Sequence, residues 1–438
     1  MDYKEALSKI EVLREYGSQP GLERVKMLLE CMGNPQDKLR FVHITGTNGK
    51  GSVCAVVSSV LNCSGYTTGL FTSPFIVDLR EQIQVDNTMI SEDEFAQVAD
   101  FVFLFVDKLM EKGVIITEFE FTMAVAFEYF LRKHCDVVVL EVGMGGLLDS
   151  TNVIKSPLCA VLTPVSLDHT GMLGSTLTEI AQHKCGIIKE GTQVVSAIQT
   201  AQVQRVLEEV CTDINVPYVY ADAESVQVLS QELSGTMVLY KGEEFTLPLM
   251  GLHQVQNLSI SLCVLEALRK KSFDNITADS MREGIKSAKN PARFEVVGEH
   301  PTVIIDGAHN PEGMRTFADT LHNLFLDKKG VIVMGMLRDK DICTSLEFIN
   351  GMFESVYTVN INNPRAMDAR KLAEICSAYF DYAEACEDAE CAFLQAYDKA
   401  KAQDTYLCVC GSLYLASQIR PYILKTIQSR GEDRISDN

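Results

Sequence analysis

Short apolar runs rich in β-branched residues alternate along the chain with longer segments whose apolar residues recur at helical spacing. The runs predict strands over Phe41–Ile44, Thr68–Phe71, Val137–Glu141, Ala160–Thr163, Gln193–Ala197 and Val216–Tyr220. The segments between them predict helices over Tyr3–Glu15, Leu22–Met32, Val53–Leu61, Ser91–Lys112, Phe119–Lys133, Thr178–Ile187 and Gln254–Leu268. Because this alternation is typical of parallel sheets covered by helices, we expect an α/β fold whose ligand crevice lies where the strands end.

A second unit is predicted to begin near Arg293. Its predicted strands are Thr302–Asp306, Gly330–Gly335, Ser355–Val359 and Tyr406–Cys410, with helical segments between them. This pattern indicates a smaller C-terminal domain, Rossmann-like and doubly wound. The polar, proline-containing stretch Ser287–Ala292 is the predicted linker, which gives domains at 1–292 and 293–438. Before the linker, Ser225–Leu249 alternates in the manner of antiparallel hairpins, and the charged tail after Arg430 is predicted to be frayed.

The composition restricts the class of protein. A chain of 438 residues with 47% hydrophobic and 22% charged residues is typical of a globular protein with two or three domains. The net charge of −20 argues against nucleic acid as a partner, but a phosphate-binding loop could still bind nucleotides. The 14 cysteines include no C-x-x-C pair, so they indicate neither a zinc site nor a redox motif. Since no signal segment and no long apolar run is present, we expect a cytoplasmic protein with no membrane partner.

The most informative motif is the glycine-rich turn after the first predicted strand. It reads Thr45-Gly46-Thr47-Asn48-Gly49-Lys50-Gly51-Ser52 and leads directly into a predicted helix. Glycines allow the backbone to approach a phosphate, the helix N-terminus favours negative charge, Lys50 adds a cation and Ser52 offers a hydroxyl to magnesium. Gly51 separates Lys50 from Ser52, unlike the common G-x-x-x-x-G-K-[ST] pattern. We therefore predict a shortened P-loop that binds nucleotide phosphates, with an ordinary tight turn as the alternative.

Other candidate residues follow predicted strands or lie on a nearby helix. Glu141 ends a buried strand before a glycine-rich turn and could reach a metal, with a solvated carboxylate as the alternative. His169 lies in a polar turn, where a histidine that only forms hydrogen bonds is the commoner case. Lys184 lies on a predicted helix, and the sequence leaves open whether it reaches solvent. Asp306 could accept hydrogen bonds from a ribose or cap a helix, and Arg293 could bridge phosphates.

Together these segments resemble the folylpolyglutamate synthase and dihydrofolate synthase family of the Mur ligase superfamily. Thr45–Ser52 matches the family's phosphate loop letter for letter, and Thr72–Pro74 resembles its metal-binding serine segment. The other matching segments occur in the family's order: Thr117–Glu120, Glu141–Asn152, Asp168–Gly171, Lys184–Lys189, His253–Asn257, Pro291–Glu295, Asp306–Pro311 and Gly411–Ala416. An ordered set of this kind is more specific than any single motif. It implies a P-loop ATPase domain followed by the C-terminal Rossmann-like domain.

The resemblance also implies roles for individual residues. The triphosphate of ATP would be bound by Thr47, Asn48, Gly49, Lys50, Gly51 and Ser52. Further contacts to ATP, across the domain interface, would come from Asn257, Arg293 and Asp306. Mg²⁺ would be held by Ser52, Ser73, Glu141 and His169, and a monovalent cation such as K⁺ is a further candidate. The catalytic residues would be Lys50, Lys184 and His309, with Lys184 carbamylated and so converted from a cation to an anion.

The implied reaction is ATP-dependent amide formation. A carboxylate of the acceptor attacks the γ-phosphate to give an acyl phosphate, and the amino group of L-glutamate then displaces phosphate. The acceptor would be a folate, with dihydropteroate as a second acceptor, and we expect the enzyme to act as a monomer. Because the reacting groups are anionic, charge neutralisation and positioning would supply most of the catalysis.

Four segments depart from the family pattern, and in one of them Thr122 stands one place earlier than expected, with Met123 in the usual threonine position. Leu147 stands where an arginine is expected, Phe75 where a histidine is expected, and Gln82 replaces the arginine of a Glu-Arg-Ile segment. Two of these changes remove positive charge expected near an anionic acceptor. They leave open a paralogous Mur-type ligase that joins an amino acid to a different carboxylate. A peptidoglycan-precursor ligase fits less well, because only about 40 residues precede the loop. A nucleotide-binding protein without catalysis is a third alternative.

Overall fold

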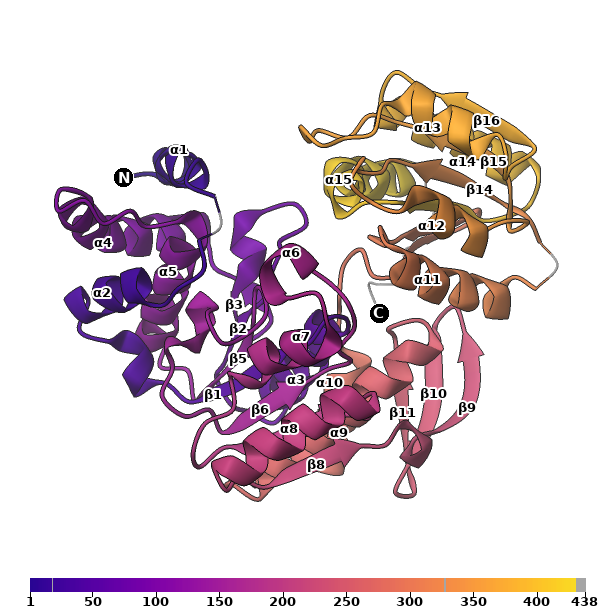
Figure 1. Cartoon of the computed structure of the whole chain (residues 1–438). Coiled ribbons are helices and arrows are strands. Elements are labelled where there is room, and N and C mark those ends of the chain that lie inside the picture. The colour runs from indigo at the N-terminus through magenta and orange to yellow at the C-terminus, as the bar shows by residue number, and fades with distance from the viewer. Residues whose placement is uncertain (18, 327, 431–438) are drawn as a thin grey trace. The chain divides into compact units, whose positions relative to one another are not determined.

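The computed structural model describes residues 1–17, 19–326 and 328–430 (Figure 1). It separates into two compact units. The first comprises Met1–Gln227, Leu239–Phe245 and Val255–Ala288, and the second comprises Val228–Val238, Thr246–Gln254 and the chain from Lys289 onward. The tail that was predicted to be frayed lies, after Arg430, outside the described residues.

An eight-stranded sheet forms the centre of the first unit. Its strand order is β4-β3-β2-β5-β1-β6-β7-β8, and the six strands from β2 to β8 in this order run parallel, whereas β3 and β4 are antiparallel additions at one edge. The strands are β1 (Phe41–Thr45), β2 (Thr68–Phe71), β3 (Ile83–Val85), β4 (Thr88–Met89), β5 (Val137–Glu141), β6 (Cys159–Leu162), β7 (Gln193–Ala197) and β8 (Tyr218–Ala221). All six predicted strands of this unit are confirmed. Every residue of β1 and β5 is buried, as expected for strands covered on both faces.

Two α-helices precede the first strand of this unit, and the others lie between or after its strands (Figure 1). The α-helices of this unit are α1 (Tyr3–Arg14), α2 (Glu23–Cys31), α3 (Lys50–Cys63), α4 (Glu92–Met110), α5 (Glu118–Arg132), α6 (Thr170–Leu173), α7 (Leu177–Cys185), α8 (Ala201–Asp213) and α10 (Ala278–Lys286). The 3-10 helices are η1 (Pro35–Lys38), η2 (Leu79–Gln82), η3 (Ser150–Val153) and η4 (Ala223–Ser225), and α9 (Leu252–Arg269) has residues in both units. Several helices begin at capping boxes. In α5, Thr117 and Glu120 satisfy each other's backbone amides, which fixes the first turn.

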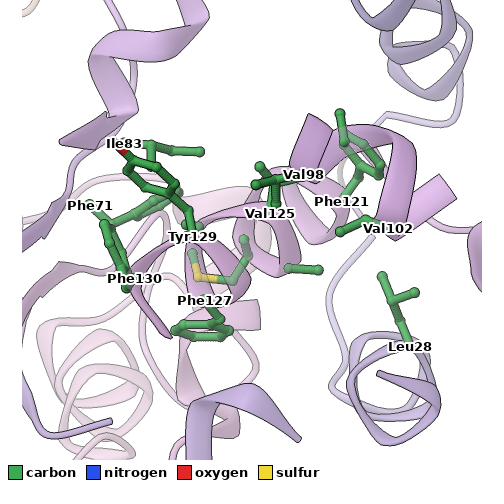
Figure 2. Packing of buried hydrophobic residues seen from close by; sticks show 14 of the residues in the cluster. Leu28, Phe71, Ile83, Val98, Val102, Phe121, Val125, Phe127, Tyr129 and Phe130 are labelled. Atoms are coloured by element: carbon green, nitrogen blue, oxygen red, sulfur yellow. The ribbon is translucent and has the colours of Figure 1, made fainter. Parts of the chain in front are cut away.

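The core of the first unit gathers around α5 (Figure 2). Phe121 and Val125 of this helix lie with Val98 and Val102 of α4, and all four side chains are almost completely buried. A fully buried side chain of this size contributes about 1.5–3 kcal/mol. The same cluster includes Phe71 and Leu140, which lie at or next to the carboxyl ends of β2 and β5.

A small sheet of order β11-β10-β9 confirms the predicted hairpin region. Its strands are β9 (Gln227–Glu232), β10 (Gly235–Tyr240) and β11 (Glu243–Leu247). Because two-residue turns join consecutive strands, neighbours must run antiparallel.

A six-stranded sheet of order β12-β13-β17-β14-β15-β16 forms the second unit. All neighbours are parallel except β12 and β13. The strands are β12 (Glu295–Glu299), β13 (Thr302–Ile305), β14 (Gly330–Met334), β15 (Phe353–Thr358), β16 (Tyr382–Ala385) and β17 (Leu407–Cys410). The helices are α11 (Pro311–Leu324), α12 (Ile342–Phe348), α13 (Ala369–Cys376), α14 (Ala389–Ala402) and α15 (Leu413–Ser429). The four strands predicted here are confirmed. Among the described residues, no helix is both long enough and apolar enough to cross a membrane.

Candidate active site

The glycine-rich loop lies between β1 and α3, and two of its glycines are required by its geometry. Gly46 has a φ of 148°, and a Cβ there would lie 1.8 Å from Thr163 Oγ1. Gly49, the N-cap of α3, has a φ of 90°, and a Cβ there would lie 2.3 Å from Asn257 Oδ1. The loop therefore packs closely against the ends of β6 and α9, and it leaves the N-terminus of α3 without a side-chain cap. A helix N-terminus without a side-chain cap favours an anion.

Hydroxyl groups attach the loop to the segment after β6. Thr47 Oγ1 donates to Ser166 O at 3.1 Å and accepts a hydrogen bond from Ser166 N at 3.0 Å. The Thr47 amide donates to Pro164 O at 2.9 Å. These contacts fix the loop from one side, and sequence reasoning assigned no role to Pro164 or Ser166.

Two lysines meet at one carbonyl of the loop. Lys50 Nζ donates to Gly46 O and to Thr47 O, each at 3.2 Å, and Lys184 Nζ donates to Gly46 O at 2.8 Å. Lys184 is only 4% exposed, so it does not reach solvent as most lysines do. Burial, together with the charge of Lys50, lowers the pKa of Lys184 from 10.5 to about 7. Near neutral pH a large fraction of this amine is therefore uncharged and nucleophilic.

Oxygen donors gather at the carboxyl ends of β2 and β5. Ser73 follows β2, and its amide donates to Glu141 Oε2 at 3.3 Å. Glu141 is 4% exposed, so the alternative of a solvated carboxylate is wrong. Ser52 lies buried on the first turn of α3. Carboxylate and hydroxyl oxygens are ligands that Mg²⁺ prefers, so these residues fit the ion.

The metal site would need ligands beyond acidic side chains. Within the described ranges, no group of three or more His, Cys, Asp and Glu residues is arranged to hold a metal. Serine hydroxyls and phosphate oxygens would complete the shell. His169 begins α6 in a left-handed conformation and is 55% exposed, and its Nε2 lies 3.7 Å from Asp168 Oδ2. The structure brings Ser73 to Glu141, whereas the role of His169 as a ligand stays a prediction.

A buried carboxylate holds the loop that follows β5. Asp149 accepts hydrogen bonds from Met144 N at 2.8 Å, Thr151 N at 3.0 Å and Thr151 Oγ1 at 2.6 Å. Burial raises the pKa of Asp149, and these donors oppose that effect. Because the hydroxyl of Thr151 donates to Asp149, it accepts from His43 Nε2, which lies 2.9 Å away.

The same loop is joined to the helix that carries Lys184. Asn152 Nδ2 donates to Leu147 O and to Gly186 O, each at 3.1 Å, and the Leu147 amide donates to His183 O at 2.7 Å. The backbone around Lys184 is therefore fixed by the segment after Glu141. Sequence reasoning placed this segment in the site but did not identify Asn152 as the link.

His43 should give the protein a measurable sensitivity to acid. It is fully buried, and burial with a smaller contribution from Lys189 lowers its pKa from 6.5 to about 3. Below pH 6.5 the unfolded chain binds a proton at His43 that the folded protein does not bind. Stability therefore falls as the pH decreases toward 3, by up to about 1.4 kcal/mol per pH unit from this residue.

We expect His43→Gln to reduce this pH dependence. Thermal unfolding midpoints measured between about pH 7 and about pH 4.5 should fall less steeply in the variant than in the wild type. His322→Gln, at an exposed histidine of α11, is the matched control and should leave the slope unchanged. An unchanged slope in His43→Gln would contradict the assignment.

In the second unit, Asp306 organises a turn rather than a helix. Its carboxylate accepts from Phe294 N and Ala308 N, both at 2.6 Å, whereas α11 is capped by Asn310. The alternative of helix capping by Asp306 is therefore wrong. Burial raises the pKa of Asp306, and the nearby charge of Arg293 opposes the rise. The imidazole of His309 lies 2.8 Å from Gly307 O through its Nδ1.

Comparison with known proteins decides the family. The Mur ligase middle domain matches residues 44–265, and the Mur ligase glutamate ligase domain matches residues 292–413. The dihydrofolate synthase/folylpolyglutamate synthase of Bacillus subtilis is 34% identical over 95% of this chain and 98% of that protein. The folylpolyglutamate synthase of Lacticaseibacillus casei is 33% identical over 97% of this chain and 99% of that protein. The chain belongs to the folylpolyglutamate and dihydrofolate synthase family of Mur ligases.

Solved structures of the folylpolyglutamate synthases agree in fold. The Mycobacterium tuberculosis enzyme complexed with ADP and AMPPCP has a TM-score of 0.86 and 30% identity, and the match covers 96% of this chain and 99% of that one. A folylpolyglutamate synthase–AMPPCP–folate complex has a TM-score of 0.82 and 32% identity, over 97% of this chain and all of that one. The α/β architecture with its two large sheets is thus that of the folylpolyglutamate synthases.

The positions that depart from the family pattern differ in environment. The Leu147 side chain is 45% exposed, and Gln82 is 6% exposed. Phe75 has the Arg14 guanidinium 5.9 Å from its ring centre. Leu147 is therefore the exposed one of the three, whereas Phe75 is half-buried against the core and Gln82 is buried.

Proposed function

We propose that this protein is an ATP-dependent ligase that adds L-glutamate to tetrahydrofolate, with dihydropteroate as a second acceptor. The observation that carries the proposal is the intact phosphate loop with Lys184 buried against Gly46, at 2.8 Å, in a chain that matches its relatives over nearly their full length. The relatives named above are folylpolyglutamate and dihydrofolate synthases, and two of the similar structures contain ATP analogues.

The residues of this chain would have the following roles in the reaction. Loop amides and Lys50 bind the triphosphate, and Asn257, Arg293 and Asp306 contact the nucleotide. The acceptor carboxylate attacks the γ-phosphate, ADP leaves, and the amine of glutamate displaces phosphate from the acyl phosphate. Mg²⁺ held by Ser52, Ser73, Glu141 and His169 would neutralise charge on the phosphates. His309 would lie near the phosphates and the substrate.

Lys184 is proposed to act as a carbamate. Its uncharged amine attacks CO₂, an N–C bond forms, and one proton is released to solvent. The product is an anion beside the phosphate loop. Two properties support this role: the lowered pKa of about 7 and the burial that excludes water from the amine.

The second candidate function is a paralogous ligase for a less anionic carboxylate. Leu147 and Leu148 are both exposed, at 45% and 44%, where the family pattern has an arginine at the first position. The arginines of the N-terminal helices are paired with acids. Arg14 Nε lies 2.9 Å from Glu118, and Arg24 Nη2 lies 3.0 Å from the buried Glu120. An anionic acceptor would have to compete for these guanidinium groups.

Phosphate release separates the candidates. The protein is assayed with ATP, Mg²⁺ and L-glutamate, and with dihydropteroate, tetrahydrofolate or no acceptor. Release that requires both glutamate and a pterin supports the proposal. Release with another carboxylate but neither pterin favours the paralogous ligase, and binding of AMPPCP with no release under any condition favours a non-catalytic nucleotide-binding protein.

We also propose 1–292 and 293–438 as the nucleotide-binding and glutamate-ligase domains.

A further inference from the structure

The turn that carries Arg293 has an unusual backbone. Ala292 has a φ of 55° and Phe294 has a φ of 47°, so both residues beside Arg293 are in the left-handed region. Residues with a Cβ rarely adopt this backbone conformation. Two such residues within three positions therefore need hydrogen bonds from neighbouring groups to hold it. The direction in which the chain presents Arg293 depends on that support.

Two carboxylates hold this turn through its amides. Glu295 Oε2 accepts from Ala292 N at 2.9 Å, and Asp306 Oδ2 accepts from Phe294 N at 2.6 Å. The Ala292 carbonyl in turn accepts from Gly307 N at 2.9 Å. Each left-handed residue is therefore fixed by a hydrogen bond from its own amide to an acid.

Glu295 is itself held by an arginine from the last helix. Arg420 of α15 donates through Nε to Oε2 at 2.8 Å and through Nη2 to Oε1 at 2.6 Å. The two side chains are 22% and 17% exposed, so solvent screens the pair only in part. A bidentate guanidinium fixes the plane of the carboxylate as well as its position. Glu295 Oε2 thus points at the Ala292 amide because Arg420 holds it there.

We propose that Arg420 and Glu295 are positioning residues, which set the left-handed turn of residues 292–294 and so direct Arg293 toward the nucleotide. The inference rests on the proposed function, in which Arg293 contacts ATP. Neither Arg420 nor Glu295 needs to touch the substrate. The competing explanation is a structural ion pair that only attaches α15 to β12.

A charge exchange distinguishes positioning from simple attachment. In the double variant Glu295→Arg/Arg420→Glu an ion pair can form again between β12 and α15. The arginine at position 295 has no acceptor for the Ala292 amide, because a guanidinium only donates. We expect the melting temperature to recover relative to Arg420→Gln, whereas affinity for AMPPCP stays about tenfold below the wild type. Recovery of both properties would show attachment alone and overturn the proposal.

Single variants at Arg420 should change the KM for ATP in a defined direction. Arg420→Gln should raise the KM for ATP about tenfold and leave the KM for glutamate nearly unchanged, and Arg420→Lys should have a smaller effect because it keeps one charged contact. Arg430→Gln is the matched control, since Arg430 pairs with Asp398 at 3.1 Å at the end of the same helix. It should leave the KM for ATP unchanged. An Arg420→Gln enzyme with wild-type KM for ATP would overturn the proposal.

AMPPCP binding by the wild type and by three variants distinguishes failure of the positioning role from failure of the proposed function. If the wild type does not bind AMPPCP, both are overturned. If Arg293→Gln weakens AMPPCP binding but folded Arg420→Gln and Glu295→Leu, which has no acceptor for the Ala292 amide, do not, the positioning role alone is overturned. If all three variants weaken it and the Arg430→Gln control does not, the positioning role is supported.

Discussion

Lys184→Met is expected to abolish glutamate ligation without destabilising the protein. Methionine has a similar length and no charge, so it fills the buried space of Lys184, which is 4% exposed. Gly46 O loses one donor at 2.8 Å but keeps Lys50 Nζ at 3.2 Å, so no carbonyl is left without a partner. The lowered pKa means that holding Lys184 in the folded protein opposes folding below pH 10.5, and methionine removes this effect. The unfolding midpoint should therefore be equal to that of the wild type or higher.

The expected loss of activity is about a thousandfold, since the variant lacks the proposed carbamate anion, which would help to hold Mg²⁺ beside the reacting phosphates. Phosphate release with ATP, glutamate and tetrahydrofolate measures it. Lys108→Met, the same substitution at an exposed position of α4, is the matched control and should retain full activity. A Lys184→Met enzyme with near wild-type turnover would contradict the catalytic role.

The carbamate makes separate predictions for the wild type. Labelled bicarbonate should give a carbamate signal in the wild type and none in Lys184→Met. Removal of bicarbonate should reduce activity reversibly. The amine of Lys184 becomes protonated below its pKa of about 7 and then cannot form the carbamate. Activity should therefore decrease as the pH falls below neutral, and this residue should cause no decrease above neutral pH. Full activity in bicarbonate-free buffer would count against the modification.

Gly49→Ala is the second substitution with a large expected effect. The new Cβ would lie 2.3 Å from Asn257 Oδ1, so the loop, α9 or both must move. Gly49 is the N-cap of α3, and a displacement there moves the amides and the Lys50 side chain that follow it. A shift of about 1 Å in such groups reduces rates about a hundredfold. We expect a loss of that size or more in phosphate release, with weaker binding of AMPPCP.

Gly113→Ala isolates the effect of backbone strain from that of the close contact. Gly113 has a φ of 79°, near the 90° of Gly49, but a Cβ there would meet nothing within 4 Å. It should lower the free energy of unfolding by about 1 kcal/mol and leave the kinetics unchanged. Equal kinetic effects of Gly49→Ala and Gly113→Ala would show that the contact with Asn257 does not matter.

Elements with a strong local pattern could be predicted from the sequence. The strands over Val137–Glu141 and Gln193–Ala197 were predicted with the bounds that the structure has, because runs of β-branched residues mark buried strands. β16 was missed, since its four residues are only half-buried or exposed and show no apolar run. β3 and β4 were missed because they are three and two residues long.

In the candidate site, residues that are contiguous in the sequence could be predicted, whereas contacts between residues far apart in the sequence could not. Residues of the phosphate loop are contiguous, so a motif identifies them. The burial of Lys184 depends on Gly46, which is 138 residues away in the chain, and nothing local distinguishes it from a solvated lysine. Arg420 gave no signal at all, because its partner Glu295 lies 125 residues earlier. Such contacts follow from the arrangement of the strands, which the order of motifs does not specify.

The way residue 147 is held has a consequence for how acceptor preference can evolve. Its amide donates to His183 O and its carbonyl accepts from Asn152 Nδ2, so hydrogen bonds to the main chain of residue 147 keep the segment in place. The Leu147 side chain is 45% exposed and takes no part in these bonds. Mutations at this codon can therefore change the chemistry offered to an incoming molecule at little expense in stability. Directed libraries that vary position 147 can therefore test whether its side chain affects acceptor preference, because its main-chain hydrogen bonds to His183 and Asn152 do not depend on the residue type.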